Sequence, residues 1–183
     1  MISKWKQDLL FVINKPIRVD NVVKFIKDGK LHNIEFPAVI WYHQDGSGNV
    51  LCYRYYFEGK KHRTDGPAEI WYYQKGVGII EHQNYYYEGH LHRTDGPAYI
   101  EYYPEGDGII RCQKYYFEGK LHRTDGPAAI RYFSIDNDKI QYETYYFEGN
   151  LHRTDGPAEI WYYPDGKVAR QLYYVNGKKR QYY

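Results

Sequence analysis

The heptapeptide His-Arg-Thr-Asp-Gly-Pro-Ala occurs four times in this chain, at a constant interval of 30 residues. A fixed period of this length is typical of repeat proteins, in which each unit buries its apolar side only by stacking on its neighbours. The copies begin at His62, His92, His122 and His152. The same period argues against most enzymatic functions, because catalysis usually requires one unique set of side chains.

The pattern within one unit predicts β-strands. From Ala68 to Tyr73 two sets of side chains alternate, which is the period of a strand. A second strand is expected from Ile79 to Tyr87, followed by a tight turn at Glu88-Gly89. Tyrosine supplies 24 of the 183 residues, and aromatic side chains favour strands. We therefore expect an all-β fold, an open array of stacked antiparallel β-hairpins with about 30 residues per repeat.

The ends of the array differ from its middle. The first copy is degraded and the last one is shortened, which favours an open array with capped ends over a closed propeller. The three basic residues at 178–180 would charge a free sheet edge and discourage strand addition. We expect an N-terminal cap at 1–21 and a repeat array at 22–183. Its units lie near 37–66, 67–96, 97–126, 127–156 and 157–183.

Comparison of the copies separates two faces of the first strand. One face repeats Ala, Ile and Tyr in every unit, as at Ala68, Ile70 and Tyr72, and is expected to build the stack. The other face varies and carries aromatic and charged residues of the kind that dominate binding surfaces. Packing of this face against a second layer is the alternative. The candidate binding residues are Trp41, Trp71, Tyr99, Glu101, Arg131 and Trp161.

The repeated polar residues are predicted to be structural. Each Arg is expected to pair with the Asp of its own or the next turn, although a row of arginines could also grip a polyanion. Equivalent histidines would lie about 10 Å apart, too far to share a metal ion. No catalytic residue, metal site or cofactor is predicted. The residues concerned are His62, Arg63, Asp65, His92, Arg93, Asp95, His122, Arg123, Asp125, His152, Arg153 and Asp155.

The stretch Tyr-Tyr-Phe-Glu-Gly-Lys-Leu-His-Arg-Thr-Asp-Gly-Pro-Ala at 115–128 resembles the MORN repeats, in particular longer variants common in giant DNA viruses of amoebae. The aromatic-aromatic-acidic-Gly core recurs at 55–59, 85–89, 115–119 and 145–149. The resemblance implies a groove-like hairpin array that serves protein contact or scaffolding, and sometimes binds lipid headgroups. Here the period is longer than in the usual MORN unit, and each copy adds the His-Arg-Thr-Asp-Gly-Pro turn.

Charge and cysteine content bear on partners and location. With 25 basic and 23 acidic residues, the chain has little electrostatic attraction for nucleic acid. Cys52 and Cys112 would lie about 19 Å apart, beyond disulfide reach, which fits reduced thiols and an intracellular protein. No run is long enough for a transmembrane segment. We expect a non-enzymatic scaffold for protein–protein interaction, and the resemblance to repeats of giant viruses implies a virion or infection-stage protein. Binding of nucleic acid or another anionic ligand is the alternative, and homo-oligomers are compatible with the array.

Overall fold

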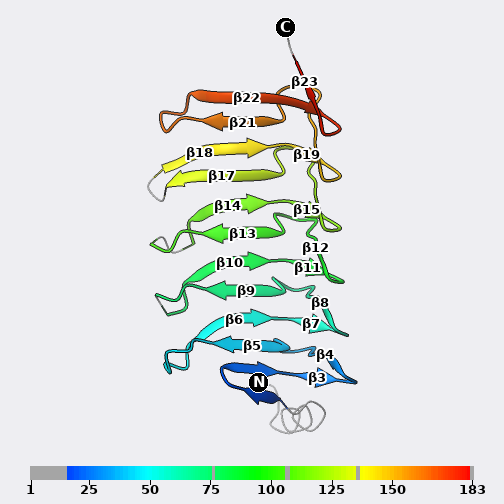
Figure 1. Cartoon of the computed structure of the whole chain (residues 1–183), viewed down its shortest axis with the longest axis vertical. Coiled ribbons are helices and arrows are strands. Elements are labelled where there is room, and N and C mark those ends of the chain that lie inside the picture. Colours follow the sequence, from blue (N-terminus) through cyan, green and yellow to red (C-terminus); the bar gives the residue numbers. More distant parts are fainter. Residues whose placement is uncertain (1–15, 76, 106–107, 135–136, 182–183) are drawn as a thin grey trace.

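The computed structural model describes residues 16–75, 77–105, 108–134 and 137–181, without the side chains of 134, 137 and 138. The molecule is all-β, and thirteen strands form one antiparallel sheet that stays open (Figure 1). The predicted fold class, an open array of stacked hairpins, is confirmed. The predicted cap at 1–21 falls largely on residues 1–15, outside the described part; residues 17–19 already form the first strand of the sheet.

The strands of the main sheet follow one another in chain order, so each unit lies beside the next. They are β1 (Ile17–Val19), β2 (Val22–Lys24), β5 (Val39–Tyr42), β6 (Val50–Arg54), β9 (Glu69–Tyr72), β10 (Ile80–Asn84), β13 (Tyr99–Tyr102), β14 (Ile110–Lys114), β17 (Ala129–Ser134), β18 (Asn137–Thr144), β21 (Glu159–Tyr162), β22 (Val168–Val175) and β23 (Lys178–Arg180).

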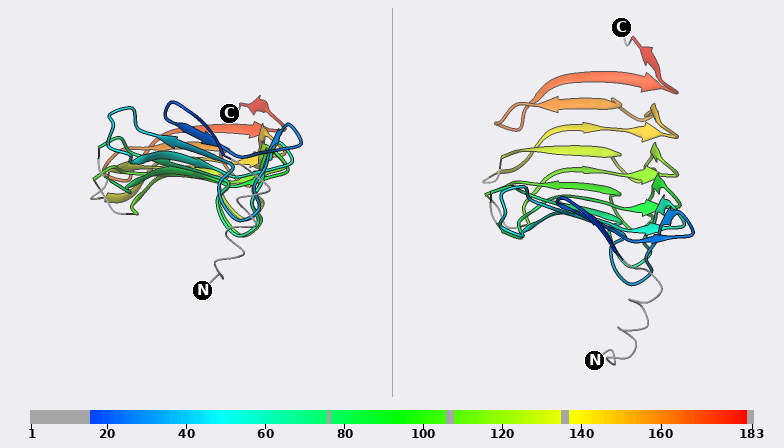
Figure 2. Two further views of the ribbon diagram at one scale, coloured as in Figure 1. Left: turned by 90° about the horizontal axis from the view of Figure 1, so that it is seen from below. Right: turned by 60° about the horizontal axis from the view of Figure 1, so that its bottom comes forward.

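Five short hairpins continue the long ones along one side of the sheet. Figure 2 shows the sheet as a single curved layer from which these hairpins bend away. They pair β3 (Ile26–Lys27) with β4 (Lys30–Leu31), β7 (Tyr56–Phe57) with β8 (Lys60–Lys61), β11 (Tyr86–Tyr87) with β12 (His90–Leu91), β15 (Tyr116–Phe117) with β16 (Lys120–Leu121), and β19 (Tyr146–Phe147) with β20 (Asn150–Leu151).

A single strand was expected at 79–87, but the chain bends within this range, and β10 and β11 are separate strands. The Tyr85 N–H bonds to the carbonyl of Ala98 in the next unit at 2.8 Å, and the chain then leaves the main sheet to form β11. Glu88 and Gly89 close the short hairpin with φ values of 47° and 88°. Two successive positive φ values match the twist of a tight hairpin, and Gly adopts them without strain.

The core is thin because the sheet has a single layer. The alanine that opens each first strand is fully buried in every unit, and the following isoleucine is nearly so at Ile100, Ile130 and Ile160. A larger side chain at the alanine position would have no room where the short hairpin and the next unit meet. Stacking of the units therefore supplies most of the interior, as expected for a repeat array. The buried alanines are Ala38, Ala68, Ala98, Ala128 and Ala158.

Candidate functional site

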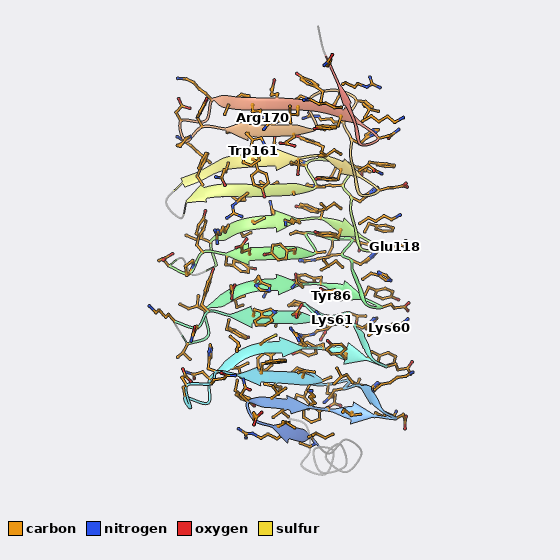
Figure 3. All side chains as sticks on the ribbon, viewed as in Figure 1. Lys60, Lys61, Tyr86, Glu118, Trp161 and Arg170 are labelled. Atoms are coloured by element: carbon orange, nitrogen blue, oxygen red, sulfur yellow. The ribbon has the colours of Figure 1, made fainter. Side chains whose placement is uncertain are left out.

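A continuous row of side chains crosses ten strands on the variable face of the sheet. Its members are partners in the strand register, so they lie side by side on one face. We call it the tryptophan row; Figure 3 shows Trp161 and Arg170, which belong to it, on neighbouring strands. The row consists of Trp41, Cys52, Trp71, His82, Glu101, Cys112, Arg131, Tyr142, Trp161 and Arg170.

Five of the six candidate binding residues fall into this row, and Tyr99 lies in the adjacent one. The register also inserts a side chain from each second strand between them, namely Cys52, His82, Cys112, Tyr142 and Arg170. The comparison of copies missed these residues because it followed only the first strand of each unit. Side chains alternate between the two faces along both strands of a hairpin. Aligning the second strand with the first across their turn would therefore have identified these residues.

The side chains of the row are less exposed than those of a sheet face that points freely into solvent. Cys52 and Cys112 are 0% and 1% exposed, since their larger neighbours cover them. Val39, Glu69 and Ala129, which lie two residues before row members on the same face of their strands, are also buried. Trp161 is exposed at 37%, and the other predicted binding residues are half-buried. Burial raises the pKa of the Cys52 thiol to about 12, so the free thiol is protonated and unreactive at neutral pH.

The aromatic and cationic groups of this face stack on one another. The Arg54 guanidinium lies between two indoles, 5.6 Å from the ring centre of Trp41 and 5.3 Å from that of Trp71. His82 follows, with its ring centre 5.8 Å from Trp71 and 5.9 Å from Tyr99. Burial lowers the pKa of His82 below its ordinary value of 6.5, which favours a neutral ring. The result is an unbroken ladder over the N-terminal half of the array.

A buried charged cluster supports this ladder from one side. The Glu69 carboxylate accepts hydrogen bonds from Arg54 Nε at 2.7 Å, Lys61 Nζ at 2.8 Å and Asn84 Nδ2 at 3.2 Å. Its side chain is only 6% exposed. We call these four residues the Glu69 cluster. Burial by itself would raise the pKa of Glu69, but hydrogen bonds and charges from Lys61 and Arg54 outweigh it and hold the pKa below 4.5.

The sequence contained one signal for this cluster that the interpretation did not use. Lys61 occupies the position that is leucine in the neighbouring short hairpins, and the next strand of the main sheet begins with the acidic Glu69. Its ammonium also lies 4.6 Å from the ring centre of Tyr86 (Figure 3). A charge that replaces a repeated apolar residue indicates a buried partner of opposite sign. The corresponding leucines are Leu31, Leu91, Leu121 and Leu151.

The repeated Arg-Thr-Asp-Gly turn forms an ion pair within its own unit. Arg63 Nε lies 2.7 Å from Asp65 Oδ1, and the guanidinium stacks 4.0 Å from the ring centre of Tyr55. A Cβ at Gly66 would approach the Arg63 guanidinium carbon to 3.3 Å, so glycine leaves space for the arginine. The hydrogen bond from Arg63 lowers the pKa of Asp65. Equivalent pairs join Arg93 to Asp95, Arg123 to Asp125 and Arg153 to Asp155.

The repeated histidines link neighbouring units. His62 Nδ1 accepts the backbone N–H of Glu88 at 3.1 Å, and its ring lies between Phe57 and Tyr87, with ring centres 6.0 Å and 4.8 Å away. The same bond recurs at His92 and His122, and His152 Nδ1 accepts from Asn176 N. Within the described residues, no three potential metal ligands gather.

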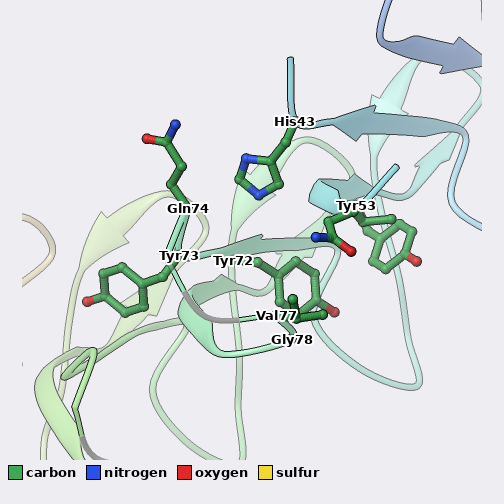
Figure 4. A pocket seen from close by; sticks show the side chains of 9 residues that line it. His43, Tyr53, Tyr72, Tyr73, Gln74, Val77 and Gly78 are labelled. Atoms are coloured by element: carbon green, nitrogen blue, oxygen red, sulfur yellow. The ribbon is translucent and has the colours of Figure 1, made fainter. Parts of the chain in front are cut away.

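The hollows of the surface are shallow. Open grooves of about 510 Å³ and 450 Å³ lie between successive Arg-Thr-Asp-Gly turns, with paired Arg and Asp residues on their walls. A pocket of about 230 Å³ lies near the loops, where Tyr53 meets Tyr72 edge to face and His43 and Val77 lie at the rim (Figure 4). Among the described residues that line the two grooves, the Thr, His, Arg and Asp side chains are the repeated ones, so neither groove has a set of its own. Their walls suit contact with a surface better than enclosure of a small molecule.

Comparisons with known proteins give no identification. No family model, no curated protein and no solved structure matches this chain. Over the described ranges, the chain has no helix that is long and apolar enough to cross a membrane. The fold and the site together define an open β-hairpin repeat array with a stacked aromatic and charged face.

Proposed function

We propose that this protein is a non-enzymatic repeat scaffold that binds a protein partner through the tryptophan row. The observation that carries the proposal is the row itself: ten strands contribute side chains in register on the face that differs between copies, and seven of these side chains are aromatic or basic. Trp, Tyr and Arg are enriched among residues that dominate binding energy. The opposite face repeats the same isoleucines and tyrosines in each unit and serves the stack.

The charge pattern supports a protein partner over a nucleic acid. Glu101 pairs with Arg111 at 3.0 Å, and Arg131 lies two strands away, so the face carries both signs. The repeated arginines, which the nucleic-acid alternative requires, are held by their own aspartates. Nucleic-acid binding depends on unpaired cations that release counterions from phosphates. A mixed, aromatic face is instead typical of protein interfaces.

The engaged state of the repeated polar residues supports the non-enzymatic part of the proposal. Each of these histidines uses Nδ1 to hold the next turn, and each arginine is fixed by an aspartate. Such groups act as structural links. Through the resemblance to MORN repeats, we extend the proposal to that class of scaffold and to a virion or infection-stage role.

The test is affinity capture with matched variants. The Trp41→Ala, Trp71→Ala, Trp161→Ala triple variant removes the indoles of the row; the control changes Val77, Ile109 and Tyr163, which are exposed outside it, to alanine. We expect the control to retain the proteins captured by the wild type and the triple variant to lose about 90% or more of them. Circular dichroism checks that both variants fold. Full retention of the captured proteins by the folded triple variant would refute the proposal. If capture is instead lost only when the salt concentration is raised, nucleic-acid binding would be favoured.

A further inference from the structure

The Glu69 cluster is not required by the backbone of the array. The same position is filled by Val39 in one unit and Ala129 in another, and both are buried in the same strand register. Moving charged groups out of water is unfavourable even when they are paired. A cluster that the fold can replace with small apolar residues therefore points to a role outside folding.

Arg54 is the member of the cluster that is prepared to bind a ligand. Its Nε is held by Glu69, and its guanidinium plane is flanked by the rings of Trp41 and Trp71. A guanidinium has five N–H donors, of which Glu69 and the nearby Cys52 thiol engage only some. The Arg54 side chain is 24% exposed, so a ligand can reach it. Preorganisation of this kind reduces the entropy lost on binding.

The charge of the cluster fits one monovalent anion. Arg54 and Lys61 carry two positive charges, and Glu69 supplies one negative charge. The next acidic residue of the row, Glu101, is already paired with Arg111. The array offers no line of unpaired arginines for a polyphosphate, since the repeated ones are bound to aspartates. The cluster has one excess positive charge, and its partly exposed donor is a planar guanidinium. A single carboxylate matches both the charge and the geometry.

The indole of Trp41 supplies a second, independent observation. Its Nε1 is buried and has no hydrogen-bond partner within the described part of the chain. An unsatisfied buried donor is destabilising and uncommon in native proteins. The Arg54 guanidinium stacks on this ring at 5.6 Å, so a group docked on Arg54 would lie beside the ring that carries the unpartnered donor.

From these observations we propose that Arg54, with Trp41 and Trp71 on either side, binds the carboxylate of an acidic side chain from the partner protein. The proposal rests on the protein-binding function for the source of that carboxylate. The site itself can be tested on the isolated protein, so its failure is distinguishable from failure of the capture experiment.

The experiment is a titration followed by the indole N–H signals in the ¹⁵N spectrum of the full chain. The probe is the blocked peptide acetyl-Ala-Glu-Ala-amide, and the control is its neutral counterpart with Gln in place of Glu, at matched ionic strength. We expect the Glu peptide to shift the Trp41 and Trp71 signals with half-saturation at roughly 10–100 mM, as one charge-assisted contact provides. The Gln peptide should leave them unchanged.

Variants assign the effect to Arg54. Arg54→Gln should abolish the shifts, and Arg180→Gln, which removes an exposed arginine of β23 outside the row, should retain them. If Arg54→Gln does not fold, Glu69→Gln decides: it keeps Arg54 and raises the net charge of the cluster, so the Glu peptide should bind several-fold more tightly. Equal shifts with both peptides, an unchanged titration in Arg54→Gln, or no gain in Glu69→Gln would each overturn the proposal. Tighter binding of inorganic phosphate than of the peptide would overturn the carboxylate assignment.

Discussion

Two junctions between repeats share one backbone register but differ in what they bury. At the junction of β6 and β9, Arg54 faces Glu69, and Lys61 of the short hairpin completes the cluster. At the junction of β14 and β17, the equivalent positions are Lys114, Leu121 and Ala129. Lys114 contacts the ring of Tyr99 at 5.2 Å, and Ala129 is buried without a charge. The same stack thus accepts either a charged or an apolar interior.

The comparison extends to the opposite face. In the later unit, Gln113 Nε2 donates to the hydroxyl of Tyr132 at 3.2 Å; one unit earlier the direction is reversed, and the Tyr102 hydroxyl donates to Gln83 Oε1 at 3.1 Å. In the β6–β9 junction this amide is replaced by Tyr53, which meets Tyr72 edge to face. Both faces therefore depart from the repeat at the same junction.

The strongest way to test the comparison is to remove the cation from each junction. Arg54→Met should lower the free energy of unfolding by about 2–3 kcal/mol, because Glu69 loses one of its two cations and both indoles lose a stacked guanidinium. This is less than for a fully buried pair, since Arg54 is partly exposed. Lys114→Met should change it by about 0.5 kcal/mol or less. Urea denaturation followed by tryptophan fluorescence measures both; similar losses would show that the junctions are equivalent.

A smaller effect is expected when the charged junction is converted to the apolar one. The Lys61→Leu, Glu69→Ala double variant copies Leu121 and Ala129 into the β6–β9 junction and leaves Arg54 to reach solvent. Because paired charges lose hydration on burial, the double variant should be as stable as the wild type or more stable by about 1 kcal/mol. Lys61→Leu alone should be less stable than the double variant, since it leaves Glu69 with one cation. A double variant much less stable than Lys61→Leu alone or Glu69→Ala alone would mean that the fold needs the cluster.

The comparison also explains how far the sequence could predict this molecule. The period, the alternation and the Glu-Gly turns were sufficient for the fold, because each is a local pattern that every copy repeats. They also distinguish a face with repeated residues from one with variable residues, although each face buries side chains, such as Ile130 on the first and Ala129 on the second. What the unit pattern did not contain was the register between neighbouring units, which inserts Cys52 and His82 between the tryptophans.

The site was predicted only in part for the same reason. Trp41, Trp71 and Trp161 were found as large aromatic residues on the face that varies between copies. The partial burial of Trp41 and Trp71 was not predicted, since it depends on the small Cys52 that the second strand places between them. The Glu69 cluster joins residues from β6, β8, β9 and β10, so no single strand carries its pattern. Its one visible sign is Lys61 in a column of leucines, a departure that matters only once its spatial partner is known.

Lowering the pH should change the difference in stability between the charged and the apolar junction. This is the smallest of the expected effects. The folded-state pKa of Glu69 is lowered, so its contribution to stability is complete above the ordinary value of 4.5 and is lost as the pH falls through and below that value. The exposed aspartates of the turns are lowered as well, through their arginines, but they are the same in wild type and double variant. The difference between the two proteins therefore isolates the cluster.

We expect the stability of the Lys61→Leu, Glu69→Ala variant, relative to wild type, to rise as the pH is lowered from about 6 to about 3. Urea midpoints at a series of pH values measure this difference directly. Lys114→Met serves as the control, because it leaves Glu69 in place and should follow the wild-type curve. Parallel curves for wild type and the double variant would show that the Glu69 carboxylate gains no stabilisation from Arg54 and Lys61, and would remove the distinction between the β6–β9 and β14–β17 junctions on which the proposed carboxylate site depends.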